Sequence, residues 1–346
     1  MNTHKNKILP IQNQRSKKAI ILCSFIALLA IMLLAVVCGN YSIPIGDVFR
    51  VIAARLGLGS AQDNNFHVIV WEVRLPRICL SALVGMALAM AGAVFQGVFR
   101  NPLVEPYLLG VSNGAACGAA IAIVFLSGVV SVSLMSFVFA IGAMLLSYGI
   151  ASRRGETPLV NLILAGVIVA SIFSAALNLI KTLAPDSKLR EISFWLMGGV
   201  YMAKWSDVML LLPCTLASLA ALWGLSWRLN VLTMGDQEAT ALGVRVGPLK
   251  LLLLGISTFI TAMAVSMVGI ISWIGLMIPH ASRMILGPDH RYTIPFSALL
   301  GACFLVICDT IARTIIMGEI PISIVTSVLG APYLIYLLRT NRQVSI

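Results

Sequence analysis

Long apolar tracts, separated by short polar segments, recur along the chain from residue 19 to residue 338. Each tract has about 20 residues, which is enough for a helix to cross the hydrocarbon core of a bilayer. The tracts are continuously apolar and show no in–out alternation, so the pattern excludes a transmembrane β-barrel. It predicts an all-α integral membrane protein, a polytopic bundle of about ten transmembrane helices. The predicted spans are 19–39, 76–97, 107–127, 132–151, 158–180, 206–226, 249–270, 272–286, 293–312 and 321–338.

The stretch 251–279 contains no ionisable residue and is too long for one span but short for two. We therefore expect a break near Gly269–Ser272, with Gly275 and Pro279 shaping the shorter half. Such breaks are tolerated at membrane depth where neighbouring helices satisfy the freed backbone groups. The longest predicted outer loop, 40–72, carries an amphipathic stretch at about 46–58 that predicts a short helix.

The composition supports this interpretation, because 59% of the 346 residues are hydrophobic and 11% are charged. In soluble proteins about a quarter of the residues are charged. The net charge of +11 follows from topology: with both termini in the cytoplasm, 15 Lys and Arg residues lie inside and 9 outside, as the positive-inside rule requires. No nucleic-acid partner is needed. The expected organisation is a basic cytoplasmic N-terminus (1–18), one transmembrane domain (19–338) and a cytoplasmic tail (339–346).

Residues that could carry catalysis or ion coupling are scarce. The seven cysteines form no C-x-x-C pair and the four histidines have no metal-ligand spacing, so neither a metal site nor a resident cofactor is expected. No G-x-x-x-x-G-K-[ST] loop is present to hold nucleotide phosphates, so any ATP used with this chain would be bound by a partner. Asp309 is the one acid that could couple an ion within a span. Two interpretations of the function remain open at this point: an ion-coupled secondary transporter, and a membrane-embedded enzyme that uses His280.

Five polar patches interrupt the apolar sequence. They are VRLPR (73–77), FRNPLVEPYLLGVSNGAA (99–116), MGDQEATALGVRVG (234–247), WIGLMIPHASRMILGPDHR (273–291) and CDTIARTII…EIPISIVTSVLGAPYLIYLL (308–338). In this order and spacing they resemble the FecCD family, the permease subunits of binding-protein-dependent ABC importers for iron–siderophores, haem and cobalamin. The resemblance runs from about residue 70 to the C-terminus.

The resemblance implies a permease of the type II importer fold in a bacterial cytoplasmic (inner) membrane. Its expected partners are a second permease subunit, two cytoplasmic ATPase subunits that hold ATP and Mg, and an extracytoplasmic substrate-binding protein. No covalent chemistry is expected on this chain. The substrate expected first is a ferric siderophore, and haem, cobalamin and an oxyanion such as molybdate are alternatives.

The loop 228–248 is the expected coupling loop, because in the family the matching segment is a short helix that contacts the ATPase. The alternative is a solvated connector. At 3.6 residues per turn, Glu238, Ala239, Leu242 and Gly243 fall on one helical face, with Asp236 or Glu238 facing basic groups of the partner. The predicted coupling residues are Asp236, Glu238, Ala239, Leu242 and Gly243.

Three arginines at the predicted outer face are candidates for docking. Arg74 and Arg77 begin the second span, and Arg313 follows Asp309 by one helical turn, where the two residues could pair. In the family, the arginines of these motifs bind glutamates of the binding protein, and arginine pairs with carboxylates in a defined geometry. The alternative is that Arg74 and Arg77 extend out of the bilayer along its interface.

The family also implies an inner gate formed by Asn101 and Leu103 with Leu159 and Val160. The alternative for the first pair is a plain helix stop, since Pro102 disfavours helix in the residue before it. At the end of the eighth span, Pro279, His280 and Arg283 are predicted to form a structural turn at the inner face. A catalytic role for His280 would require a base or metal partner, and none lies near it in sequence.

Overall fold

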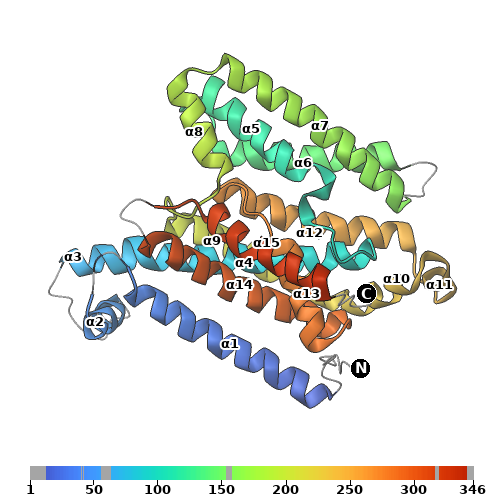
Figure 1. Cartoon of the computed structure of the whole chain (residues 1–346), viewed down its shortest axis with the longest axis horizontal. Coiled ribbons are helices and arrows are strands. Elements are labelled where there is room, and N and C mark those ends of the chain that lie inside the picture. Colours follow the sequence, from blue (N-terminus) through green and yellow to red (C-terminus); the bar gives the residue numbers. More distant parts are fainter. Residues whose placement is uncertain are drawn as a thin grey trace.

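The computed structural model describes residues 13–39, 41, 43–55, 64–152, 158–315 and 319–340. Every element formed by these residues is helical (Figure 1). The elements are α1 (Gln14–Val37), α2 (Ile45–Arg55), α3 (Asn64–His67), the π-helix η1 (Val68–Arg74), α4 (Leu75–Val98), the 3-10 helix η2 (Pro106–Leu109), α5 (Val111–Phe125), α6 (Val132–Ala151), α7 (Leu159–Leu183), α8 (Asp186–Leu196), α9 (Trp205–Gly224), α10 (Ser226–Met234), α11 (Asp236–Ala241), α12 (Val246–Val268), α13 (Ile274–Leu286), α14 (His290–Thr314) and α15 (Ile322–Thr340).

The helices follow the predicted spans in order. Among the described residues, seven helices are long and apolar enough to cross a membrane, and α5, α13 and α15 are shorter apolar helices. The amphipathic helix expected in the 40–72 loop is confirmed as α2. The spans are therefore predicted correctly to within a few residues, apart from α1, which begins five residues early, and α5, which begins four residues late.

The centre of the bundle is α4, which is buried along nearly its whole length and packs against α14, α12 and α13. Two glycines allow α4 and α14 to touch: a Cβ on Gly85 would lie 2.2 Å from the carbonyl oxygen of Gly301. Small residues permit this close approach of transmembrane helices. On one side of α4 lie α14 and α1, and on the other α5, α6, α7 and α8 form a separate layer (Figure 1).

The two ends of the bundle carry different segments. At one end, called the α11 end, Lys17 of α1 lies over the ring of Tyr292 at 5.1 Å. There Asn230 of α10 also donates a hydrogen bond to Asp289, just before α14. The opposite end carries α2 and α8, and is called the α8 end (Figure 1). Because α12 runs from one end to the other with 23 residues, the ends are separated by roughly 33 Å at 1.5 Å per residue.

The predicted break between α12 and α13 is confirmed at residues 269–273. Gly269 and Trp273 have positive φ values of 74° and 78°, and the freed backbone groups find partners on other elements. The hydroxyl of Tyr107 donates to the carbonyl of Ile271 at 2.8 Å. The backbone N–H of Gly199 donates to the carbonyl of Val268 at 2.7 Å. Irregular backbone at this depth is therefore satisfied inside the protein.

One turn prediction is wrong. Pro279, His280 and Arg283 lie within α13, which continues to Leu286. A proline inside a helix leaves the carbonyl four residues earlier without its donor, and that carbonyl belongs to Gly275. The side-chain amide of Gln96 on α4 donates to Gly275 at 3.3 Å and to Leu276 at 3.0 Å.

The side chain of Gln96 therefore supplies a donor to the carbonyl that Pro279 leaves without its helical partner. Gln96 also accepts a hydrogen bond from the guanidinium of Arg283, which is completely buried. The side chain of His280 is likewise buried, and its Nδ1 lies 3.3 Å from the hydroxyl of Tyr333.

Candidate functional site

The short helix α11 is anchored through its first residue. Asp236 lies 2.6 Å from the ammonium group of Lys250, which is 4% exposed at the start of α12. The other carboxylate oxygen of Asp236 lies 3.9 Å from the guanidinium of Arg100, in the turn after α4. Asp236 thus connects three segments of its own chain, whereas its sequence pattern predicted contact with a partner.

The end of α11 is set by Gly243, with φ of 80°. Its N–H donates to the carbonyl of Thr240 and the N–H of Val244 donates to Ala239, both at 2.9 Å. This pair of bonds is the Schellman motif, which favours glycine because other residues are strained at positive φ. Gly243 therefore has a structural role that its position in the sequence did not reveal.

The expected outward face of α11 is only partly present. The side chains of Glu238 and Leu242 are exposed, and Leu242 is 58% exposed although it is apolar. Ala239 is completely buried, so the expectation that it shares the outward face is wrong. Its small side chain packs beneath the helix, whereas Glu238, Leu242 and Gly243 of the predicted set are exposed and remain available to a partner.

The predicted gate residues lie in two places. Pro102 lies in the turn after α4, and the side chain of Asn101 accepts a hydrogen bond from the N–H of Leu103 at 2.9 Å. Leu103 and Val160 are exposed apolar residues, whereas Leu159 is half-buried against the main core. The preceding residue Arg100 brings this turn next to Asp236, so the structure places the turn beside α11.

The three predicted docking arginines all point into their own chain at the α8 end. Arg77 donates from Nε to Asp309 at 2.9 Å and from Nη1 to Glu319 at 2.7 Å. Asp309 is buried, but the side chain of Glu319 is 46% exposed. Arg74 and Arg313 are also buried. Glu319 was not identified from the sequence, since it lies 242 residues from Arg77.

The other two arginines mainly bind backbone oxygens. Arg74 donates to the carbonyl of Val36 at 2.6 Å, and Arg313 donates to the carbonyl of Ala35. The Asp309–Arg313 pair suggested by their spacing is present at 3.8 Å, beyond hydrogen-bond distance, so Arg77 is the closer partner of Asp309. The cluster joins α1, α4 and α14.

A polar cluster that the sequence did not predict lies at the α11 end. Asn230 on α10 donates to Asp289 at 2.7 Å, and its amide oxygen accepts from the N–H of His290 at 2.9 Å. Burial of Asp289 opposes its charge, but hydrogen bonds from Arg291 and Asn230 outweigh it and keep the pKa of this carboxyl below its ordinary value. These contacts fasten α10, and through it α11, to the connection between α13 and α14.

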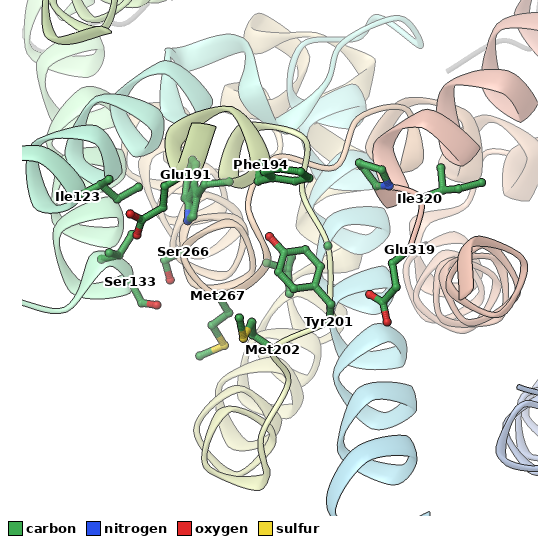
Figure 2. Close-up of a pocket in the computed structure, with 15 residues that line it drawn as sticks. Ile123, Ser133, Glu191, Phe194, Tyr201, Met202, Ser266, Met267, Glu319 and Ile320 are labelled. Carbon is green, nitrogen blue, oxygen red and sulfur yellow. The ribbon is translucent and has the colours of Figure 1, made fainter. Parts of the chain in front are cut away.

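A cavity of about 690 Å³ lies at the α8 end, and it too was not predicted (Figure 2). It is bordered by the ends of α5, α8 and α12, the start of α6, the turn at 199–202 and residues 319–321. Within the described part of the chain, no group of three His, Cys, Asp or Glu residues is arranged to hold a metal ion.

Comparison with known proteins identifies the class. The FecCD transport family matches residues 27–340. The chain is 44% identical over 294 residues to the cobalamin import system permease protein BtuC of Halobacterium salinarum, covering 85% of this chain and 79% of that protein. It is 36% identical over 295 residues to the molybdate import system permease protein MolB of Haemophilus influenzae, covering 85% and 87%.

A solved structure gives the same result. An inward-facing metal-chelate type ABC transporter superimposes with a TM-score of 0.84 at 34% identity, covering 93% of this chain and 99% of that chain. The chain therefore belongs to the FecCD transport family. It is a multi-span permease subunit of an ABC importer, a transport component rather than an enzyme.

Proposed function

We propose that this chain translocates a ferric siderophore across a bacterial cytoplasmic membrane, with both termini in the cytoplasm. In this proposal two permease subunits form the pathway, and two cytoplasmic ATPase subunits supply energy from ATP and Mg. An extracytoplasmic protein delivers the substrate. The observation that carries the proposal is α11, a short exposed helix fixed to the bundle by the pair between Asp236 and the buried ammonium group of Lys250.

The anchoring of α11 explains how a partner could move the bundle. Force applied to Glu238 or Leu242 would pass through Asp236 to α12 and to the turn that holds Asn101 and Leu103. A solvated connector needs no such pair, and burying the ammonium group of Lys250 is favourable only with a counterion. We therefore assign ATPase coupling to α11 and inner gating to the neighbouring turn.

Docking of the binding protein is proposed at the opposite end. The guanidinium of Arg77 is covered on its outer side by Glu319, whose side chain is half-exposed. A carboxylate of the binding protein would have to replace Glu319 as the partner of Arg77. Arg74 and Arg313 would then hold the surrounding helices in position, through their bonds to carbonyls near the end of α1.

The coupling assignment is tested by affinity purification of the full chain from its native membrane, with mass spectrometry of the proteins that accompany it. We expect an ATPase subunit with the wild type and its loss with Glu238→Arg. The Glu238 carboxylate folds back to Gly235, where a Cβ would lie 1.9 Å from it, so this change also affects the helix start. Leu242→Asp alters the exposed surface without touching that contact, and Glu72→Arg is the matched control on η1, an element of the α8 end. Retention of the ATPase by both α11 variants would contradict the assignment.

The substrate requires its own test, because the relatives named above are importers of cobalamin and of molybdate. Uptake of labelled ferric siderophore, haem, cobalamin and molybdate is measured in cells with and without this chain. We expect the ferric siderophore to depend on the chain most strongly. If the uptake of only one of the other three compounds depended on the chain, that compound would replace the siderophore as the proposed substrate. The importer assignment would remain intact.

A further inference from the structure

The cavity at the α8 end has the size of a binding site for a small molecule. Its volume of about 690 Å³ falls within the range of about 300–1,000 Å³ that is usual for ligand pockets. Figure 2 shows Tyr201 in the middle of the lining, with Glu191 and Glu319 on opposite sides of it. Most of the remaining lining is apolar, including Phe194 and Met202, which are exposed.

The turn that carries Tyr201 is held in place from two sides. Gly199 donates to the carbonyl of Val268 at the end of α12, and Gly198 accepts from the N–H of Ile322 at the start of α15. A Cβ on Gly199 would lie 2.5 Å from the ring of Tyr201, so the ring rests directly on the glycine backbone. The cavity is therefore bordered by fixed elements and does not depend on a single side chain.

The charged side chains in the lining of the cavity are both acidic, and each has a cationic partner just outside the lining. Among the fifteen described residues that line it there are two acids, Glu191 and Glu319, and no Lys, Arg or His. Glu191 is paired with Lys188 at 3.0 Å and Glu319 with Arg77 at 2.7 Å, and both carboxylates remain about half-exposed. Burial and the neighbouring Glu319 carboxylate raise the pKa of Tyr201, so its hydroxyl remains a neutral donor.

We propose that this cavity binds the imported substrate, and that it selects a compact ferric chelate with an apolar surface and a neutral or positive charge. This inference rests on the proposed function and narrows its substrate class. Aromatic and Met side chains suit the apolar shell of such a chelate, and the carboxylates attract its positive charge. A bare oxyanion or a strongly anionic chelate would find no cation in the lining, and would instead face the half-exposed carboxylate oxygens of Glu191 and Glu319.

Glu319 gives the site a direct connection to docking. Its carboxylate both lines the cavity and covers Arg77, the arginine at which the binding protein is proposed to dock. A docking carboxylate that takes over Arg77 would free Glu319 beside the cavity. The negative charge available to a cationic chelate would then be greatest at the moment when the binding protein releases its cargo.

Binding is measured on the full chain in lipid nanodiscs, without binding protein, using two iron-labelled probes in equilibrium dialysis. Ferrioxamine B is a positively charged ferric trihydroxamate, and ferric enterobactin is a strongly anionic ferric catecholate. Unlabelled molybdate serves as competitor. Glu191→Lys reverses one charge of the lining, and Ser133→Trp fills the cavity from the exposed first turn of α6. Glu72→Lys, an exposed glutamate outside the lining, is the matched control.

We expect saturable binding of ferrioxamine B, at least tenfold tighter than ferric enterobactin and unaffected by molybdate. Glu191→Lys should weaken it about tenfold, Ser133→Trp should abolish it, and Glu72→Lys should leave it unchanged. Absence of saturable binding, tighter binding of the catecholate, or equal binding by all variants would overturn the proposal. Retention of the ATPase is recorded in the same preparations. An intact complex with no chelate bound refutes only the proposed binding in the cavity. Chelate bound without an ATPase refutes only the proposed coupling of the ATPase to this chain.

Discussion

The ammonium group of Lys250 lies 2.6 Å from the carboxylate of Asp236, although the lysine side chain is 4% exposed and the aspartate 46%. The pair spans the junction between α11 and α12. The same carboxylate lies 3.9 Å from Arg100, so the first residue of α11 connects the helix to two parts of the bundle. A displacement of α11 is therefore transmitted to α12 and to the turn after α4.

Removing the charge of Asp236 should destabilise the bundle. In Asp236→Asn the buried ammonium group of Lys250 loses its counterion, and we expect a loss of about 1–3 kcal/mol, the usual penalty for a buried polar group without its partner. Denaturant unfolding in detergent measures it. Asp236→Asn/Lys250→Met should recover part of the loss, since it removes the unpaired charge. A single variant as stable as the wild type would contradict the structural role of the pair.

The arginine cluster offers a second test. Arg77→Met leaves the buried carboxylate of Asp309 without its closest partner, and such a change costs about 3–5 kcal/mol. Arg77→Met/Asp309→Leu should restore at least half of that stability in the same unfolding measurement. The exposed Arg50–Asp47 pair is the control, because Arg50→Met should change stability by less than about 1 kcal/mol. Equal effects of Arg77→Met and Arg50→Met would show that burial of the cluster has been misjudged.

The contact between α4 and α14 predicts a difference between two glycines. Gly85→Ala places a methyl group 2.2 Å from the backbone of Gly301, and overpacking of this kind costs about 1–3 kcal/mol. At Gly142 on α6 nothing lies within 4 Å of the added Cβ. Gly142→Ala should therefore be neutral or stabilising by up to about 1 kcal/mol. The prediction is tested by comparing the midpoints of denaturant unfolding of the two variants. A Gly85→Ala variant as stable as the wild type would argue against the close approach of α4 and α14.

The end of α11 is predicted to depend on backbone conformation rather than on space. Nothing lies within 4 Å of a Cβ at Gly243, but its φ is 80°. Asparagine tolerates this region and β-branched residues do not. Gly243→Asn should keep ATPase co-purification near the wild-type amount, and Gly243→Val should lower it several-fold. Equal retention by the two variants would mean that the Schellman turn is not needed for coupling.

Much of the architecture could be predicted from the sequence, because each span is a long apolar tract that can be recognised without knowing which helices it packs against. The same holds for the break at Gly269, which follows from an uncharged tract of the wrong length for one or two helices. The donor to the carbonyl that Pro279 leaves free could not be predicted in this way. It is the amide of Gln96, which lies 179 residues from Gly275 in sequence.

In the candidate sites, too, local features could be predicted from the sequence, whereas contacts between distant segments could not. The position of α11 and its exposed residues Glu238 and Leu242 follow from the local pattern, but the burial of Ala239 depends on packing against the bundle. Arg77 was identified from its motif, yet its partner Glu319 comes from the far end of the chain. The cavity is formed by segments of α5, α6, α8, α12 and residues 319–321, and no local pattern indicates that these meet.

The most direct test of the central claim is substrate uptake into proteoliposomes that contain this permease, its ATPase and its binding protein. With labelled ferric siderophore delivered by the binding protein, we predict accumulation that requires ATP and Mg at the ATPase face and that is lost in Leu242→Asp. Accumulation driven by a proton or sodium gradient without ATP, and unchanged in Leu242→Asp, would contradict the account and favour a secondary transporter.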